Sequence, residues 1–170
     1  ISLDMIRFFP LNGPGYRQVA GQFDDEIKGG NTKKMVVIAG RKDVQGFRFS
    51  YTGGGGVYVW ESSAVFTQTG GSIIYNTAGN YGGGVFIYQG RATLSGGQIV
   101  SNTANNGGGV YVDHSTASFA QTGVSTVTHN AADKGGGVYI DEGSTTISAG
   151  QIVSNTVSDD GGGIYVGQSG

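Results

Sequence analysis

The sequence predicts an all-β protein, a right-handed parallel β-helix (β-solenoid) with three short strands in each coil of about 25–28 residues. Two repeated motifs predict this fold. The first is a glycine triplet followed by a strand in which an aromatic residue lies between two aliphatic ones, and these strands begin at Val57, Val85, Val110, Val138 and Ile164. The second motif is an aliphatic residue three positions before an asparagine, and it ends at Asn76, Asn102, Asn130 and Asn155. A short apolar segment lies between the two motifs in each repeat, so each repeat supplies three strands and three turns.

The strands after the glycine triplets are expected to form one parallel sheet. Their first residues are 28, 25, 28 and 26 positions apart, so each strand comes one coil after the last. Three short strands cannot bury an apolar face alone, and the coils must therefore stack at about 4.8 Å. Alternation along a strand places Val110 and Val112 inward and Tyr111 outward. The handedness of crossovers between parallel strands predicts a right-handed coil.

The recurring asparagines are interpreted as a structural ladder. Their side-chain amides are expected to hydrogen-bond from coil to coil at one turn, in backbone conformations that other residues disfavour. The glycine triplets are expected to form another turn, where the chain has no room for a Cβ atom and φ is positive at some residues. A phosphate-binding loop is the alternative for such glycines, but no helix is predicted after them and no Lys-Ser/Thr pair is present.

Residues 1–50 fit the repeat poorly and are expected to form an N-terminal cap and an irregular first coil, with the β-helix repeats over residues 51–170. Strands are expected within residues 34–40 and 47–49, and residues 1–23 are expected to cover the open end of the first coil. The chain stops in the first strand of a new coil. This leaves open a self-assembling extracellular filament or sheath, in which copies stack end to end.

Composition argues against several kinds of protein and partner. Glycine is abundant, with 34 of 170 residues, but the 2 prolines and the lack of a G-X-Y period exclude collagen. The net charge of -2 offers no basic surface to nucleic acid or to an anionic membrane. Without cysteine there is no disulfide and no thiolate metal site. We expect no cofactor, no metal and no membrane insertion by this segment.

The two motifs, over about residues 53–170, resemble the GGAI and FxxN repeats of chlamydial polymorphic membrane proteins. More broadly, they are similar to the adhesin-like β-helix proteins of bacterial surfaces. In this chain the motifs read GGGV or GGGI, and IIYN, IVSN, VTHN and IVSN. The resemblance implies a non-catalytic, secreted or cell-surface region that binds a glycan or a host or cell-surface protein, with no catalytic residues to transfer.

An outward aromatic strip is the candidate binding surface. We expect it to be partly exposed, with its rings stacked along the solenoid axis. Stacking alone explains such a strip, whereas a contact surface for sugar rings or another protein is the functional interpretation, and both stay open. The strip comprises Tyr58, Phe86, Tyr111, Tyr139 and Tyr165, extended by Trp60 and Tyr88. A second strip, which could form a lateral contact, comprises Ile74, Val100, Thr128 and Val153.

A pair of carboxylates leaves an enzymatic alternative open. Asp113 and Asp141 share one repeat position, and adjacent coils would place them about 5 Å apart, a separation compatible with a retaining glycosidase. The segment from Val110 to His114 is similar to the vWiDH stretch of pectate lyases, but the arginine motif that supplies the lyase base is missing. A polysaccharide lyase or glycosidase of the parallel β-helix type is therefore an alternative.

Other polar residues have simpler interpretations. His114 and His129 are expected on different faces of the coil, which disfavours a zinc site. Asp159 and Asp160 are interpreted as a solvated turn in preference to a calcium site. Ice binding would require a flat, regular threonine array, and the threonines are expected to be scattered.

Overall fold

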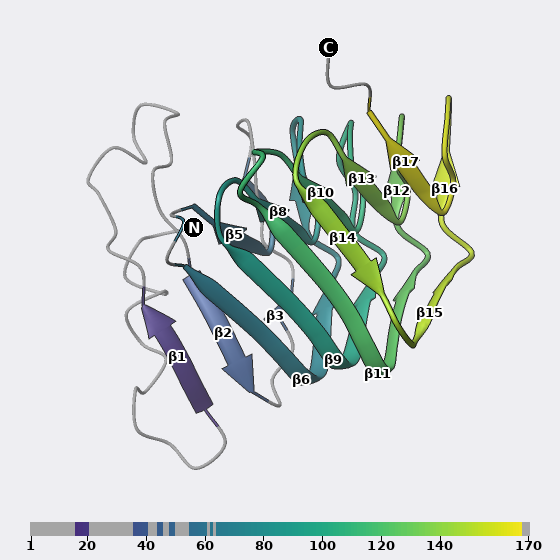
Figure 1. The fold of residues 1–170 in the computed structure, drawn as a ribbon. Coiled ribbons are helices and arrows are strands. Elements are labelled where there is room, and N and C mark those ends of the chain that lie inside the picture. Colours follow the sequence, from purple (N-terminus) through teal and green to yellow (C-terminus); the bar gives the residue numbers. More distant parts are fainter. Residues whose placement is uncertain are drawn as a thin grey trace.

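The computed structural model is a parallel β-solenoid of about four turns with three parallel sheets, and its described part contains no helix (Figure 1). The structure describes residues 55–60, 62 and 64–167. It also describes the backbone of four earlier strands: β1 (Tyr16–Ala20), β2 (Val36–Gly40), β3 (Val44–Gln45) and β4 (Arg48–Phe49). The predicted fold class is confirmed.

The strands that follow the glycine triplets form a five-stranded sheet, here called the short-strand sheet. It consists of β5 (Val57–Val59), β8 (Val85–Ile87), β10 (Val110–Val112), β13 (Val138–Ile140) and β17 (Ile164–Val166), in that order. All neighbours are parallel and pair without a shift, so that Tyr111 lies between Phe86 and Tyr139. This is the register that the sequence predicts.

The second sheet, here called the long-strand sheet, differs from the expected division of the coil. The sequence predicts two strands here, one from the short middle apolar segment and one from the residues before each asparagine. In three coils these two segments form a single long strand, and in the last coil they are two separate strands. The strands are β3, β6 (Val65–Ile74), β9 (Arg91–Val100), β11 (Ser118–Thr128), and β14 (Ser144–Ile147) with β15 (Gln151–Val153). The register shifts near the middle of the strands, between Gln121 and Val124 for example, and this irregularity replaces the expected turn.

The third row of strands follows the asparagines, where the sequence analysis expects only a turn. Parallel pairs form between β4 and β7 (Thr77–Ala78) and between β12 (Ala131–Ala132) and β16 (Thr156–Val157). Single bridges through Thr103 connect the two pairs, from Thr77 to Ala131. Each coil therefore has three parallel segments, with boundaries that differ from the expected ones.

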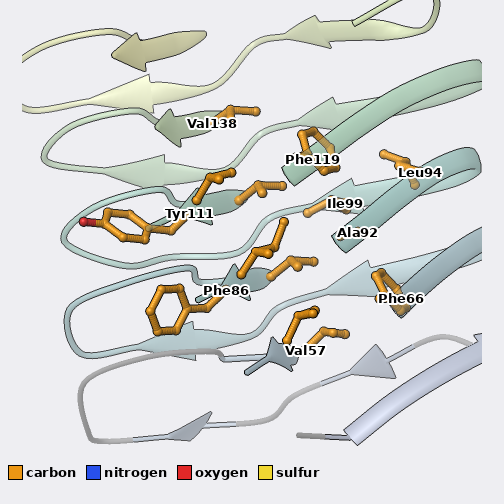
Figure 2. Packing of buried hydrophobic residues seen from close by; sticks show 14 of the residues in the cluster. Val57, Phe66, Phe86, Ala92, Leu94, Ile99, Tyr111, Phe119 and Val138 are labelled. Atoms are coloured by element: carbon orange, nitrogen blue, oxygen red, sulfur yellow. The ribbon is translucent and has the colours of Figure 1, made fainter. Parts of the chain in front are cut away.

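The core lies between the short-strand and long-strand sheets (Figure 2). In β5, β8 and β10, the aliphatic residues on both sides of the outward aromatic residue are fully buried, as Val110 and Val112 are. They pack in one cluster with Leu94, Ile99 and Phe119 of the long strands. Full burial of such a side chain stabilises the fold by about 1.5–3 kcal/mol, so the repeated inward positions dominate the stability.

The asparagine ladder is confirmed, and Asn76, Asn102 and Asn130 of its four members are buried. Asn102 Oδ1 accepts a hydrogen bond from the Asn76 backbone N–H and another from the Asn76 side-chain amide, both at 2.9 Å. Asn130 Oδ1 accepts the same two bonds from Asn102, at 2.9 and 3.0 Å, and Asn155 Oδ1 accepts them from Asn130. The Nδ2 group of Asn102 also donates to the Ile73 carbonyl oxygen at 2.9 Å. Each side chain therefore joins backbone groups of two coils.

The unusual backbone conformation at this turn belongs to the residue before each asparagine, which corrects the expectation that the asparagine itself adopts it. The left-handed φ values are 58° at Tyr75 and 54° at Ser101, His129 and Ser154. Such values cost energy for residues with a Cβ atom, and the ladder that follows holds them in place.

The glycine triplets form tight turns, as expected. The first glycine of the triplet has a positive φ in four coils, for example 65° at Gly107. The second glycine lies against the neighbouring coil, and a Cβ atom on Gly108 would come within 2.7 Å of the Ala131 carbonyl carbon. Glycine is therefore required here for coil spacing as well as for φ.

The N-terminal expectations are tested only in part. Strand β2 falls within residues 34–40 and pairs antiparallel with β1, whereas β3 and β4 pair parallel with β6 and β7. Residues 1–15, 21–35 and 47, where the rest of the proposed cap and strands lies, are outside the described residues.

At the C-terminal end, β17 begins a new coil, and its inward residue Val166 is 66% exposed. Within the described ranges, no helix has the length and apolarity needed to cross a bilayer.

Replacement of Asn102 by alanine should destabilise the protein by roughly 2–4 kcal/mol. The change removes the buried acceptor for Asn76 and the donor for the Ile73 carbonyl oxygen, and each lost buried partner costs about 1–3 kcal/mol. The measurement is urea denaturation followed by far-UV circular dichroism. The control is Asn105→Ala, because Asn105 is exposed and its side chain makes only a 3.4 Å contact with Asn80. Equal stability of the two variants would contradict a structural role for the ladder.

Replacement of Gly108 by alanine should prevent close stacking of two coils. The new Cβ atom would meet the backbone of Ala131, which cannot move without separating the strands. Gly70→Ala is the matched control, since no atom lies within 4 Å of its Cβ position. We expect Gly108→Ala to lower the melting temperature strongly and Gly70→Ala to leave it nearly unchanged. Similar melting temperatures would contradict the packing argument.

Candidate functional site

The outer face of the short-strand sheet carries two columns of side chains, one residue from each coil. The aromatic column comprises Tyr58, Phe86, Tyr111, Tyr139 and Tyr165. The rim column lies two residues further along each strand and comprises Trp60, Tyr88, Asp113, Asp141 and Gly167. Backbone hydrogen bonds of 2.7–2.9 Å continue the parallel ladder to the rim column, for example from Asp113 N–H to the Ile87 carbonyl oxygen. The register of the sheet therefore places both columns in line.

The aromatic column is less exposed than the sequence predicts, and this expectation is wrong for three of its five members. Tyr58, Phe86 and Tyr111 are only 8%, 5% and 4% exposed, whereas Tyr139 and Tyr165 are half-buried. Figure 2 shows the Phe86 and Tyr111 rings on the side of their strands that faces away from the core. The rings do point away from the core, and other parts of the chain cover their outer side.

In the coils that the structure describes, residues just before the glycine triplets lie against rings of the aromatic column. Tyr81, Asn106 and Lys134 directly precede their triplets and are bridged to one another in register. The Tyr81 ring lies 4.6 Å from the Tyr111 ring, and Lys134 Nζ lies 5.4 Å from the centre of the Tyr165 ring. The positive φ of the first glycine turns the chain back at this point. The sequence contains no signal for this cover, because the residues directly before the triplets differ in type.

Ring stacking leaves ring edges, and few ring faces, toward solvent. Trp60 and Tyr88 stack at 4.4 Å with an angle of 12°, and Tyr58 and Phe86 stack at 4.9 Å with an angle of 8°. Further along the axis, the Tyr139 ring lies 4.8 Å from Tyr111. Since the paired faces contact each other, a sugar ring cannot lie on them. Among the stacked residues, Trp60, Tyr88, Tyr139 and Tyr165 are the half-buried ones.

The rim column places two carboxylates in adjacent coils. The Tyr111 hydroxyl donates a hydrogen bond of 3.1 Å to Asp141 Oδ2. The Asp113 carboxylate makes no hydrogen bond with another described side chain. Partial burial, together with the negative charges of Asp141 and Glu142, raises the pKa of Asp113 to about 6, although His114 acts in the opposite direction. The two carboxyl groups, which share one repeat position, therefore interact electrostatically.

The tyrosines beside this pair keep their protons. Burial, followed by the charges of Asp141 and Asp113, raises the pKa of Tyr111 far above its ordinary value. Burial and Asp113 raise the pKa of Tyr58 in the same way, and burial also raises the pKa of Tyr139. Tyr111 is therefore a permanent hydrogen-bond donor to Asp141.

His114 begins an exposed turn beside the rim column. Its ring lies 5.6 Å from the Tyr88 ring, and its Nδ1 accepts a hydrogen bond from the Thr116 backbone N–H at 3.3 Å. Glu142 of the next coil accepts a 3.1 Å bond from the Ser115 N–H. His129 lies elsewhere, at the end of β11, beside Thr128 Oγ1 at 2.9 Å. Among the described residues, no group of three or more potential ligands is placed to hold a metal ion.

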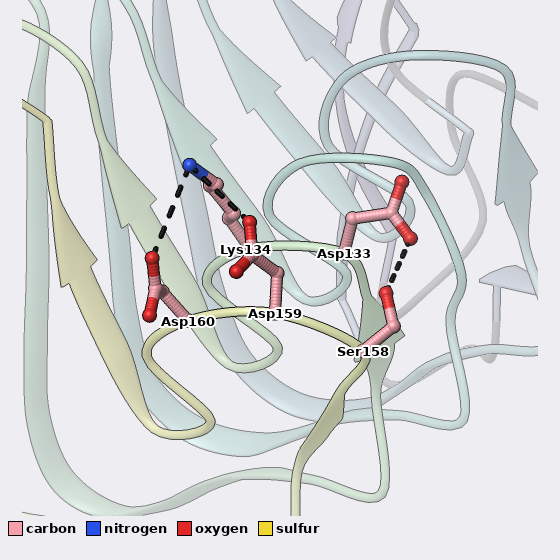
Figure 3. A network of polar contacts seen from close by, with 5 residues as sticks. All are labelled: Asp133, Lys134, Ser158, Asp159 and Asp160. Carbon is pink, nitrogen blue, oxygen red and sulfur yellow. Dashed lines mark hydrogen bonds and ion pairs between the residues drawn. The ribbon is translucent and has the colours of Figure 1, made fainter.

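Asp159 and Asp160 lie with Lys134 in a polar network on the segment before the triplets (Figure 3). Lys134 Nζ lies 3.4 Å from an Asp159 oxygen and 3.9 Å from an Asp160 oxygen. In the same network, Ser158 Oγ donates to Asp133 Oδ1 at 2.7 Å. The ammonium group balances the paired acids, which supports the interpretation as a solvated turn.

The second strip lies in register on the long-strand sheet. Ile74, Val100 and Thr128 are half-buried, and Val153 is exposed. Three of the threonines considered for ice binding are less scattered than expected, since Thr77, Thr103 and Thr156 share one register position, interrupted by Ala131.

Comparisons with models of protein families, with curated proteins and with solved structures gave no match. The functional argument therefore depends on the outer face of the short-strand sheet. Its accessible part, here called the rim patch, comprises Trp60, Tyr88, Asp113, His114, Asp141 and Glu142.

Replacement of Tyr111 by serine should destabilise the protein by roughly 3–5 kcal/mol, because it removes a buried ring that contacts Phe86, Tyr81 and Tyr139. Chemical denaturation measures the change. Tyr75→Ser is the control, since Tyr75 is 64% exposed and serine already occupies the same left-handed position at Ser101 and Ser154. A stable Tyr111→Ser protein would show that the aromatic column is dispensable for the fold.

Proposed function

We propose that this chain is a non-catalytic, adhesin-like binding region of a secreted or cell-surface protein, related in kind to the β-helix repeats of chlamydial polymorphic membrane proteins. The observation that carries the proposal is the rim patch. It is a row of hydrogen-bonding groups, partly accessible and held in register by the sheet beneath it. A surface of this kind suits recognition, because its groups are already ordered before a ligand binds.

The chemistry of the rim patch favours a glycan as the ligand. Carboxylates accept hydrogen bonds from sugar hydroxyls, and the Tyr88 hydroxyl can donate or accept. The Asp113 carboxylate has no donor among the described side chains, so a ligand hydroxyl could bond to it. The negative charges of Asp113, Asp141 and Glu142 disfavour an acidic polysaccharide and favour a neutral or amino sugar.

The buried aromatic column supports binding indirectly. Tyr58, Phe86 and Tyr111 are covered, so they position the rim patch and offer no area to a ligand. Trp60 and Tyr88 stay half-buried and bring ring edges to the surface. The binding surface that we propose is therefore the rim patch, with Tyr139 and Tyr165 at its border.

Combined Tyr88→Phe and Glu142→Gln substitutions should weaken glycan binding at least about tenfold while the fold survives. Phenylalanine keeps the stack on Trp60 and removes only the hydroxyl, and glutamine keeps an acceptor for Ser115. A lost hydrogen bond costs about 1 kcal/mol and one to a charged group about 1.5–3 kcal/mol. A glycan array identifies ligands, and calorimetry with the strongest one measures the change. Tyr75→Phe, at the exposed turn after β6, is the control.

Three outcomes would contradict the proposal. Unchanged glycan affinity in the double variant would remove the rim patch as the site. Attachment to cells that survives enzymatic removal of their glycans would indicate a protein partner. Release of reducing or unsaturated sugar ends from a polysaccharide panel, stopped by Asp113→Asn, would establish the glycosidase or lyase alternative.

A further inference from the structure

One hydrogen bond joins the two columns across neighbouring coils. Tyr111 belongs to the aromatic column of one coil, and its hydroxyl donates to Asp141 in the rim column of the next coil. The bond is thus diagonal, from β10 to the residue that follows β13. A donor at this position of the repeat stabilises the ionised form of the carboxyl group that it faces.

The same diagonal one coil earlier lacks its donor. Phe86 occupies the position equivalent to Tyr111, and Asp113 occupies the position equivalent to Asp141. Phenylalanine has no hydroxyl, so Asp113 does not receive the bond that Asp141 receives. Two carboxyl groups at one register position therefore have different environments, although the repeat places them on equivalent backbone.

The charges around Asp113 are predominantly negative. Asp141 and Glu142 face it from the next coil, and His114 is its neighbour in sequence. The tyrosines that act on it electrostatically, Tyr58 and Tyr111, remain neutral because burial holds their protons. The adjacent member of the rim column, Tyr88, also contributes no charge as a phenol.

We propose that Asp113 and Asp141 form a pH-sensitive clasp between adjacent coils. At acidic pH, Asp113 takes up a proton from solvent and its carboxyl O–H donates to the Asp141 carboxylate. At neutral pH, both groups are ionised and repel each other across the coil spacing of about 4.8 Å. The clasp is a property of the fold and does not depend on the proposed binding function.

The direction of the pH dependence follows from proton linkage. The pKa of Asp113 is raised from its ordinary value of 3.8 to about 6 in the folded chain. The folded state therefore binds a proton more tightly than the unfolded state does. The resulting stability is present below the ordinary pKa and is lost as the pH rises through about 6.

The experiment compares the unsubstituted 170-residue chain with its Asp113→Asn variant by urea denaturation between pH 4.5 and 7.5. Asparagine imitates the protonated acid, because its amide can donate to Asp141 at every pH. The folding equilibrium constant of the wild-type chain, relative to that of the variant, should rise as the pH falls through 6, by up to about tenfold per pH unit. Parallel pH profiles for the two proteins would overturn the clasp.

Phe86→Tyr provides a second, independent test by restoring the missing donor. The new hydroxyl should lower the pKa of Asp113, which carbon-13 NMR of the carboxyl groups measures directly, and move the pH-dependent step to lower pH. If the added hydroxyl prevents folding, the wild-type titration still decides, since an Asp113 that titrates at its ordinary value would overturn the proposal.

Discussion

Hydrogen bonding through the buried asparagines sets the register on which the other features of the solenoid depend. The side-chain carbonyl oxygens of Asn102, Asn130 and Asn155 each accept two bonds from the preceding asparagine, so neighbouring coils can stack in only one alignment at this turn. The coils differ in length by a few residues, and the alignment forces these differences into the turns and into the irregular middle of the long strands. The sheets thus stay in register even though the repeat is inexact.

A fixed register makes equivalent positions contact one another. Aromatic residues form a stack, glycines permit the close approach of backbones, and carboxylates become neighbours. Stacking is favourable for the first two classes and unfavourable for carboxylates, which repel. Asp141 offsets this cost with the Tyr111 hydroxyl, whereas Asp113 does not. In the rim patch, stacking therefore places carboxylates that repel each other at neighbouring positions. Unfavourable arrangements of this kind are typical of functional positions.

Periodicity was sufficient to predict the fold, the pairing of the strands after the glycine triplets, the asparagine ladder and the shared register position of Asp113 and Asp141. It could not predict what covers an outward residue, because alternation distinguishes the two faces of a strand and says nothing about a turn that folds back on one of them. Tyr111 is outward and yet buried for this reason. Nor could a pattern of residue types show that the left-handed backbone falls on Ser101, before the asparagine. The hydrogen bond from the Tyr111 hydroxyl to Asp141 joins two different repeat positions in adjacent coils, so it could be found only from the structure.

The stacked aromatic rings also determine the fluorescence of the protein. The chain contains a single tryptophan, and Trp60 stacks on Tyr88 within a line of aromatic rings that continues through Phe86, Tyr111 and Tyr139. Excitation energy absorbed by the tyrosines can transfer through space to Trp60, because tryptophan has the lowest excited state of these rings. Trp60 emission therefore depends on whether several successive coils are stacked. It can serve as an intrinsic fluorescence probe of folding.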